Sequence, residues 1–309
     1  MRAGAYTPPP MVYLLLFVIC GLHFSQLLRL GQQRSYRTMA VVGVNYVLAA
    51  AVSAALMFLL GGWAARGRGV LLALGAANGV LFVVHVLVMM ASFRVAGTGI
   101  TWAFVSSGVV IPVLAAFFFW GEEVNAAQWT ALGLVPAAVL LLRPPAREES
   151  GAGSRPGLKG DVFLALCLLI AGAIGTLHKA QDFYVQSIPV AGTATGIISP
   201  ERLLYQAALF VATAIVSLVY MAAKRMWPER GETFIGLGVG AANTCGLFFT
   251  LLALSAVGAT VFFPTSGCLV ILGNSVAGRI FWRERLAGRQ RIGLAVALAI
   301  VVLANLRAS

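Results

Sequence analysis

The sequence predicts an all-α polytopic membrane protein, with ten transmembrane helices arranged as two inverted five-helix repeats (5+5). Three observations carry this prediction. The 309-residue chain is 60% hydrophobic and only 10% charged, which is far from the composition of an ordinary soluble domain. It contains ten long apolar runs. Two short motifs also recur in its second half at nearly the same spacing.

Most of the apolar runs reach the roughly 20 residues that a helix needs to cross a ~30 Å hydrocarbon core. They cover residues 11–30, 39–63, 70–92, 97–120, 126–142, 161–181, 203–223, 234–257, 259–282 and 292–306. The first run is long enough for a signal peptide, but no small-residue cleavage site follows it. We therefore expect it to remain as a helix.

The two recurring motifs divide the chain into halves. The tetrapeptide GAAN occurs at residues 75–78 and again at 240–243, an offset of 165. Trp120 opens WGEEVNAAQ and Trp282 opens WRERLAGRQ, an offset of 162. The prediction is a first repeat over 1–143, a polar linker over 144–160 and a second repeat over 161–309. Because five is odd, the second repeat enters the membrane from the opposite side, as in many secondary transporters.

The fourth and ninth runs also carry a resemblance. The segments VIPVLAAFFFWGEE and ILGNSVAGRIFWRERLAGRQRIG resemble the EamA-like branch of the drug/metabolite transporter superfamily, and the resemblance covers nearly the whole chain. It implies a ten-helix transporter with a central cavity lined mainly by the first, third, fourth, sixth, eighth and ninth helices. It implies no particular substrate. Many relatives have a Trp-Gly pair early in the first helix, where this chain has Cys20 and Gly21.

The leading hypothesis is a secondary transporter of small organic solutes, importing or exporting by alternating access, multi-pass in the cell (inner) membrane. The alternatives are a non-transporting membrane scaffold and a lipid-modifying membrane enzyme. The chain has no HExxH, GxSxG or paired-carboxylate motif, so we expect no catalytic residues. None of its acidic residues is expected in mid-span, which favours a neutral, zwitterionic or anionic solute. We expect a monomer or weak dimer.

Charge and cysteines indicate no further partner. The net charge of +12 comes from basic residues in short loops, which signal membrane orientation and not nucleic-acid binding. The four cysteines lie within apolar runs without metal-ligand spacing, so we expect no metal and no cofactor. Odd-numbered loops hold fourteen basic residues, against five in the even loops and termini. This count favours termini outside the cell, whereas the family resemblance favours termini inside, and both remain open.

Three histidines lie inside predicted spans that the resemblance places around the cavity: His23, His85 and His178. They are the only side chains there that change charge near neutral pH, so any proton coupling is expected to depend on them. The alternative is that each one bonds a neighbouring helix. None has the spacing of a helical zinc site.

The GAAN asparagines are the other main candidates. Asn78 precedes His85 by seven residues and Asn243 precedes Thr250 by seven, so each pair shares one helix face. Both stripes should face the protein interior, because lipid satisfies no polar group. The asparagines then line a central site, or they bond backbone carbonyls of adjacent helices.

Further candidates lie on other helices. Trp102 and Ser106 form a polar-aromatic stripe, and Pro112 in the same run favours a gating kink. The counterpart of Pro112 in the second repeat is Asn274. Two cations close to helix ends, Arg29 and Lys179, are candidates for binding a substrate anion. The simpler interpretations are extension to the membrane interface and, for Lys179, a local ion pair with Asp182.

Overall fold

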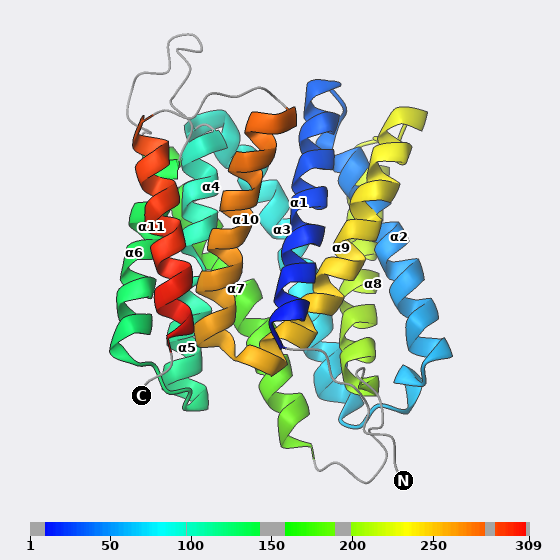
Figure 1. Cartoon of the computed structure of the whole chain (residues 1–309). Coiled ribbons are helices and arrows are strands. Elements are labelled where there is room, and N and C mark those ends of the chain that lie inside the picture. Colours follow the sequence, from blue (N-terminus) through cyan, green and yellow to red (C-terminus); the bar gives the residue numbers. More distant parts are fainter. Residues whose placement is uncertain (1–9, 97, 143–157, 189–198, 282–287, 307–309) are drawn as a thin grey trace. The chain divides into compact units, whose positions relative to one another are not determined.

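The computed structural model describes residues 10–96, 98–142, 158–188, 199–281 and 288–306. Within these ranges the chain forms eleven α-helices, one 3₁₀ turn and no strand (Figure 1). The elements are α1 (Pro10–Gln33), α2 (Thr38–Leu59), η1 (Gly62–Ala64), α3 (Arg68–Ala96), α4 (Thr98–Ser107), α5 (Val110–Trp120), α6 (Ala126–Leu142), α7 (Leu158–Ser187), α8 (Pro200–Ala223), α9 (Arg230–Val257), α10 (Ala259–Phe281) and α11 (Gly288–Asn305).

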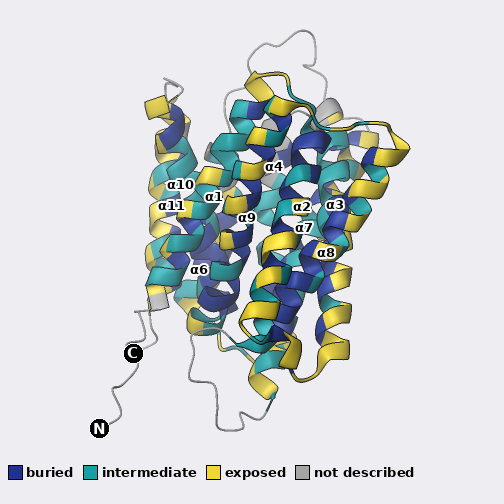
Figure 2. Ribbon diagram, turned by 90° about the vertical axis from the view of Figure 1, so that its right-hand side faces the viewer, coloured by how far each residue is buried: buried dark blue, intermediate teal, exposed yellow. Residues whose placement is uncertain are grey.

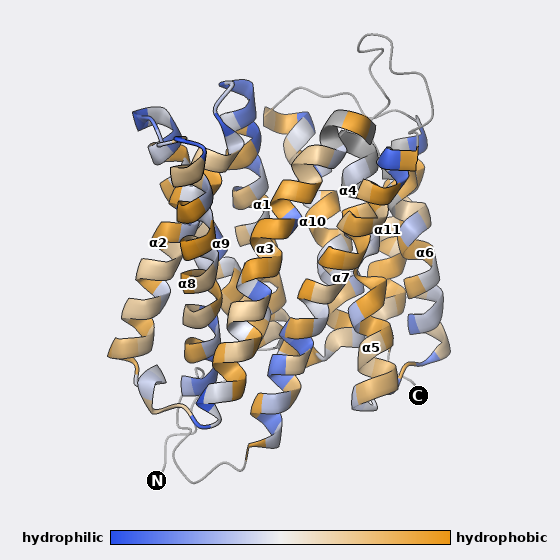
Figure 3. Ribbon diagram, turned by 180° about the vertical axis from the view of Figure 1, so that it is seen from behind, coloured by the Kyte–Doolittle hydropathy of each residue, from blue (hydrophilic) through white to orange (hydrophobic). Residues whose placement is uncertain are grey.

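Seven of these helices are long and apolar enough to cross a membrane, namely α1, α2, α3, α7, α8, α9 and α10. In hydrocarbon a helix satisfies its own backbone polar groups, which is why runs of this composition adopt it. Hydrophobic residues cover the lengths of the helices, and hydrophilic residues gather at their ends (Figure 3). The prediction of an all-helical, multi-pass membrane protein is confirmed at this level.

The fourth apolar run differs from the prediction of one continuous helix. It forms α4 and α5, which are separated by Gly108 and Val109. Pro112 lies in the first turn of α5 and has no N–H to donate to the Gly108 carbonyl, which accepts instead from Ile111 N at 3.1 Å. A Cβ on Gly108 would lie 2.8 Å from the carbonyl oxygen of Leu168 on α7. Close packing and the missing donor therefore interrupt the helix at the same place.

Helix α7 is longer than the predicted run of 161–181, since it continues to Ser187. Asp182 therefore lies inside a helix and is fully buried, whereas the sequence suggested a position at the helix end. Of the predicted linker over 144–160, residues 144–157 lie outside the described residues, and residues 158–160 belong to α7. The start of the second WxE motif, including Trp282, also lies outside the described residues.

The chain divides into two compact units. Unit 1 comprises Met1–Val83 and Ala180–Val257, and unit 2 comprises Val84–Lys179 and Gly258–Ser309. Each unit thus combines segments from both halves of the sequence, and the division falls inside α3 and α7.

In unit 1, α2 packs against both α8 and α9, and α9 also packs against α1. Small residues bring these helices close together. The core beside α1 contains Val41, Ile235 and Val239. In unit 2, α6 packs along α11, and α10 contacts α5, α6 and α11. Its core is built from alanines and branched residues, including Ala131, Ala297 and Ile300. The helices bury one face and expose another (Figure 2). Many of the exposed residues are large and hydrophobic, as expected beside lipid.

Candidate functional site: the polar interior of unit 1

The first GAAN motif joins α3 to α8. A Cβ on Gly75 would lie 2.8 Å from the carbonyl oxygen of Tyr205, so the two helices touch through their backbones. One turn along α3, the Asn78 amide donates to the Tyr205 hydroxyl at 2.7 Å. Both Asn78 and Tyr205 are fully buried. The glycine and the asparagine of this motif therefore contact the same residue of α8.

The second GAAN motif joins α9 to α2 in the same way. A Cβ on Gly240 would lie 2.8 Å from the carbonyl oxygen of Asn45. The Asn243 amide donates to the Asn45 side-chain oxygen at 3.1 Å. Again the glycine approaches the backbone of one residue and the asparagine bonds its side chain.

These two contacts, which we call the clasps, are matched in position. Each one pairs the third apolar run of one half of the sequence with the second run of the other half. The residues that the two motifs contact, Asn45 and Tyr205, are 160 positions apart, close to the GAAN offset of 165. Both asparagines donate to a side chain of the neighbouring helix.

Helix α8 carries further polar contacts across unit 1. The Gln206 amide donates to Ser53 Oγ on α2 and to the Thr244 carbonyl on α9, each at 3.2 Å. Thr213 Oγ1 donates to the Gly79 carbonyl on α3 at 3.2 Å. Together with the clasp at Tyr205, these bonds connect α8 to three neighbouring helices.

At one end of α8 lies a buried ion pair. The Arg202 guanidinium is 3.5 Å from the Asp182 carboxylate on α7, and Gln186 donates to the same carboxylate at 2.8 Å. Asp182 is fully buried, and the Arg202 side chain is 14% exposed. A buried charge of this kind is stable only when it is paired and hydrogen-bonded.

Several buried polar atoms of unit 1 have no hydrogen-bond partner within the described part of the chain. Gln181 on α7 is fully buried, and neither its amide nitrogen nor its amide oxygen is paired. The Gln206 side-chain oxygen, Ser217 Oγ and Asn45 Nδ2 are unpaired as well. Such groups are costly to bury alone and are normally matched by water or by a ligand. They leave unit 1 with donors and acceptors for a polar molecule.

Unit 2 contains a charged cluster around Lys179 and Glu122. The Lys179 ammonium pairs with the Glu122 carboxylate at 2.5 Å, and both side chains are largely buried. The same carboxylate accepts from the backbone N–H groups of Ala259 and Thr260 at 3.0 and 3.2 Å. Glu122 thus caps α10, where the helix dipole favours a negative charge. Lys179 therefore has a partner on another element, beyond the local Asp182 that its spacing suggested.

The predicted histidines have three different environments. His23 is exposed, with Nδ1 3.0 Å from the Ile19 carbonyl of its own helix. His85 is partly buried, and its Nε2 has no partner among the described residues. His178 is buried. His23 belongs to unit 1, and the other two belong to unit 2.

The remaining predicted residues are spread over both units. Thr250 is buried and donates to the Gly246 carbonyl of its own helix at 2.9 Å. Pro112 is buried and packs against Gly175 of α7. Arg29 on α1, Ser106 on α4 and Asn274 on α10 are partly buried. Trp102 belongs to α4, but its side chain lies outside the described part of the structure.

Sequence reasoning missed Asn45, Gln181, Tyr205 and Gln206. The available signal was an uncharged polar or amphipathic residue within, or at the edge of, an apolar run. No group of three or more His, Cys, Asp or Glu side chains suited to a metal ion occurs among the described residues.

No protein-family model matches this chain, and no curated protein matches its sequence. Solved structures do match its fold. One of them, titled "Crystal structure of protein", matches with a TM-score of 0.69 over 96% of this chain and 96% of its own length, at 14% sequence identity. At that identity the likeness shows the fold alone: this polytopic helical architecture also occurs in a crystallised protein of distant sequence.

Proposed function

We propose that this protein is a secondary transporter that moves small organic solutes across the cell (inner) membrane by alternating access. The observation that carries the proposal is the pair of matched clasps, Gly75 and Asn78 on Tyr205, and Gly240 and Asn243 on Asn45. Equivalent contacts between the same two helices of opposite halves are what an inverted five-helix repeat produces. That architecture is typical of secondary transporters.

Contacts between helix ends support the ten-span arrangement, counting α4 and α5 as one span. In unit 1, Arg37 in the first connection bonds Glu232, next to the seventh connection, at 2.7 Å. This hydrogen bond raises the pKa of the Arg37 guanidinium. In unit 2, the Asn125 amide in the fourth connection donates to the carbonyl of Leu306, after the last span, at 2.9 Å. In each contact, an even number of spans separates the two partners along the chain. With ten crossings, both partners of each contact therefore lie on the same side of the membrane.

The unpaired amide groups of unit 1 favour a polar molecule as the transported solute. Gln181 presents a donor and an acceptor, and Gln206 presents an acceptor, all of them buried. A neutral, zwitterionic or anionic organic molecule offers the complementary groups. We therefore assign Gln181 as the first residue to test for solute contact.

The experiment compares metabolites in cells with and without the full chain, followed by uptake of the differing compounds into proteoliposomes. We expect one class of small organic solutes to differ severalfold and to be taken up. The variant Gln181→Leu should reduce that uptake, whereas Gln32→Leu, the same change at an exposed position, should not. An unchanged metabolite profile with no uptake contradicts transport. A changed lipid composition instead favours the membrane-enzyme alternative.

A further inference from the structure

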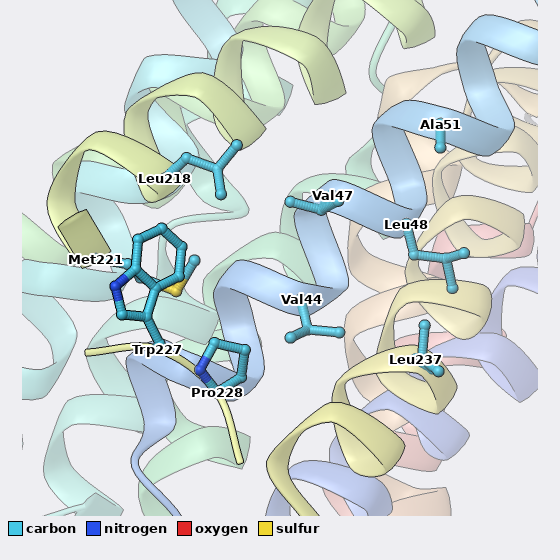
Figure 4. Close-up of a pocket in the computed structure, with 9 residues that line it drawn as sticks. All are labelled: Val44, Val47, Leu48, Ala51, Leu218, Met221, Trp227, Pro228 and Leu237. Carbon is cyan, nitrogen blue, oxygen red and sulfur yellow. The ribbon is translucent and has the colours of Figure 1, made fainter. Parts of the chain in front are cut away.

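The outer face of unit 1 contains an apolar groove between α8 and α9, with α2 as its floor (Figure 4). Its volume is about 320 Å³, and all nine residues that line it are hydrophobic. Leu218 of α8 and Leu237 of α9 lie on opposite sides, with Val44 and Val47 of α2 between them (Figure 4). The groove offers apolar contacts to a hydrocarbon chain and no polar side chain to a polar solute.

A second hollow of about 310 Å³ adjoins this groove and shares Pro228 and Leu237 with it. Unlike the groove, it is lined in part by a cation and a hydroxyl, those of Arg230 and Thr233. The two hollows therefore form one site with an apolar part and a polar, basic part. A phospholipid has the same division between its acyl chain and its headgroup.

The basic part has charge available for a ligand. Lys224, Arg225 and Arg230 are all exposed at the connection between α8 and α9. Within the described part of the chain none of the three forms an ion pair. The neighbouring Arg37 differs, because its guanidinium is occupied by Glu232 and Glu229. Three unpaired cations therefore lie in the connection that follows α8, and one of them, Arg230, lines the second hollow.

Trp227 places this site at the edge of the membrane. It lies four residues after the end of α8, lines the groove, and is 59% exposed. Tryptophan at the end of a transmembrane helix is typical of the headgroup level, where its ring contacts chains and headgroups at once. The site therefore lies at the depth where a lipid's phosphate meets its acyl chains.

We propose that the groove binds one anionic phospholipid of the bilayer, with an acyl chain along α2 and its headgroup beside Lys224 and Arg230. The apolar groove alone does not select a lipid, because the surrounding hydrocarbon is equally apolar. Selection comes from the unpaired cations, which attract acidic headgroups. This inference is independent of the transport proposal.

Native mass spectrometry of the detergent-solubilised full chain tests it, with phosphatidylglycerol and phosphatidylcholine as the two probes. The wild-type protein should retain one phosphatidylglycerol more tightly than phosphatidylcholine. Each cation is expected to contribute roughly fivefold to the affinity for phosphatidylglycerol. The double variant Lys224→Gln with Arg230→Gln should therefore bind phosphatidylglycerol about 25-fold more weakly. The matched control, Lys159→Gln with Arg291→Gln, removes two exposed cations from unit 2 and should change nothing.

A second pair of variants tests the apolar part. Ala51 is exposed on α2 and lines the groove, so Ala51→Trp should fill it and release the lipid. Ala55→Trp, one turn further along and outside the groove, should retain it. The proposal is overturned if the wild type holds both lipids equally, or if either the charge variant or Ala51→Trp binds phosphatidylglycerol as tightly as the wild type.

Discussion

The middle of unit 1 and the charged cluster of unit 2 join helices by different means. Along α8, uncharged side chains such as Tyr205, Gln206 and Thr213 each make one or two separate hydrogen bonds to neighbouring helices. In unit 2, the single carboxylate of Glu122 pairs with Lys179 and caps α10. Interhelical hydrogen bonds in membranes contribute about 1 kcal/mol each, so unit 1 should tolerate the loss of one. Unit 2 should not tolerate the loss of Glu122 or Lys179.

The largest effect is therefore expected in unit 2. Lys179→Met should destabilise the protein by about 3–5 kcal/mol, because it leaves a largely buried carboxylate without its cation. Glu122→Gln should cost a similar amount, because it leaves the more deeply buried Lys179 ammonium without its carboxylate. Thermal unfolding in detergent measures both. The double variant should recover part of the loss, and strictly additive effects would show that the two groups do not interact.

The next effect separates the backbone part of each clasp from its side-chain part. Gly75→Ala and Gly240→Ala should each cost about 1–3 kcal/mol, because the new methyl would meet a carbonyl oxygen that cannot move aside. Gly133 on α6 has open space around it, so Gly133→Ala is the matched control and should be close to neutral. Equal stability of all three variants in thermal unfolding would contradict close contact at the clasps.

The two clasp asparagines should differ from each other. Asn78→Ala should cost about 1–2 kcal/mol, since it leaves the fully buried Tyr205 hydroxyl without this partner. Asn243→Ala should cost less, because Asn243 is only partly buried and its bond is longer. Flux per folded molecule is the second measurement: a normal value in both variants assigns the asparagines to helix packing, whereas loss of flux with retained stability assigns them to the solute site.

The smallest change in stability is expected for Gln181→Leu. Leucine removes two buried polar atoms that lack partners within the described chain, so stability should stay the same or rise slightly. Uptake should nevertheless fall if Gln181 contacts the solute. A marked loss of stability would show instead that Gln181 is held by partners within the protein, and the assignment to the solute would then fail.

The sequence alone determined that the chain is all-helical with apolar helices long enough to cross a membrane, since helix formation in an apolar run of about 20 residues depends on the run itself and on the surrounding lipid. It also identified the GAAN motifs and their offset. It did not indicate that α4 and α5 are separate, because that break depends on Gly108 meeting α7 as well as on Pro112.

Only the tertiary structure decided which residues the motifs contact. Nothing in the spacing of Asn78 points to Tyr205, and helical periodicity offers Lys179 a nearby Asp182 but not the distant Glu122. Burial of Gln181 likewise depends on the helices around it and not on its own neighbours in sequence. The physical reason is that periodicity fixes which residues share a helix face, whereas the partner of that face is set by how helices from different parts of the chain pack together.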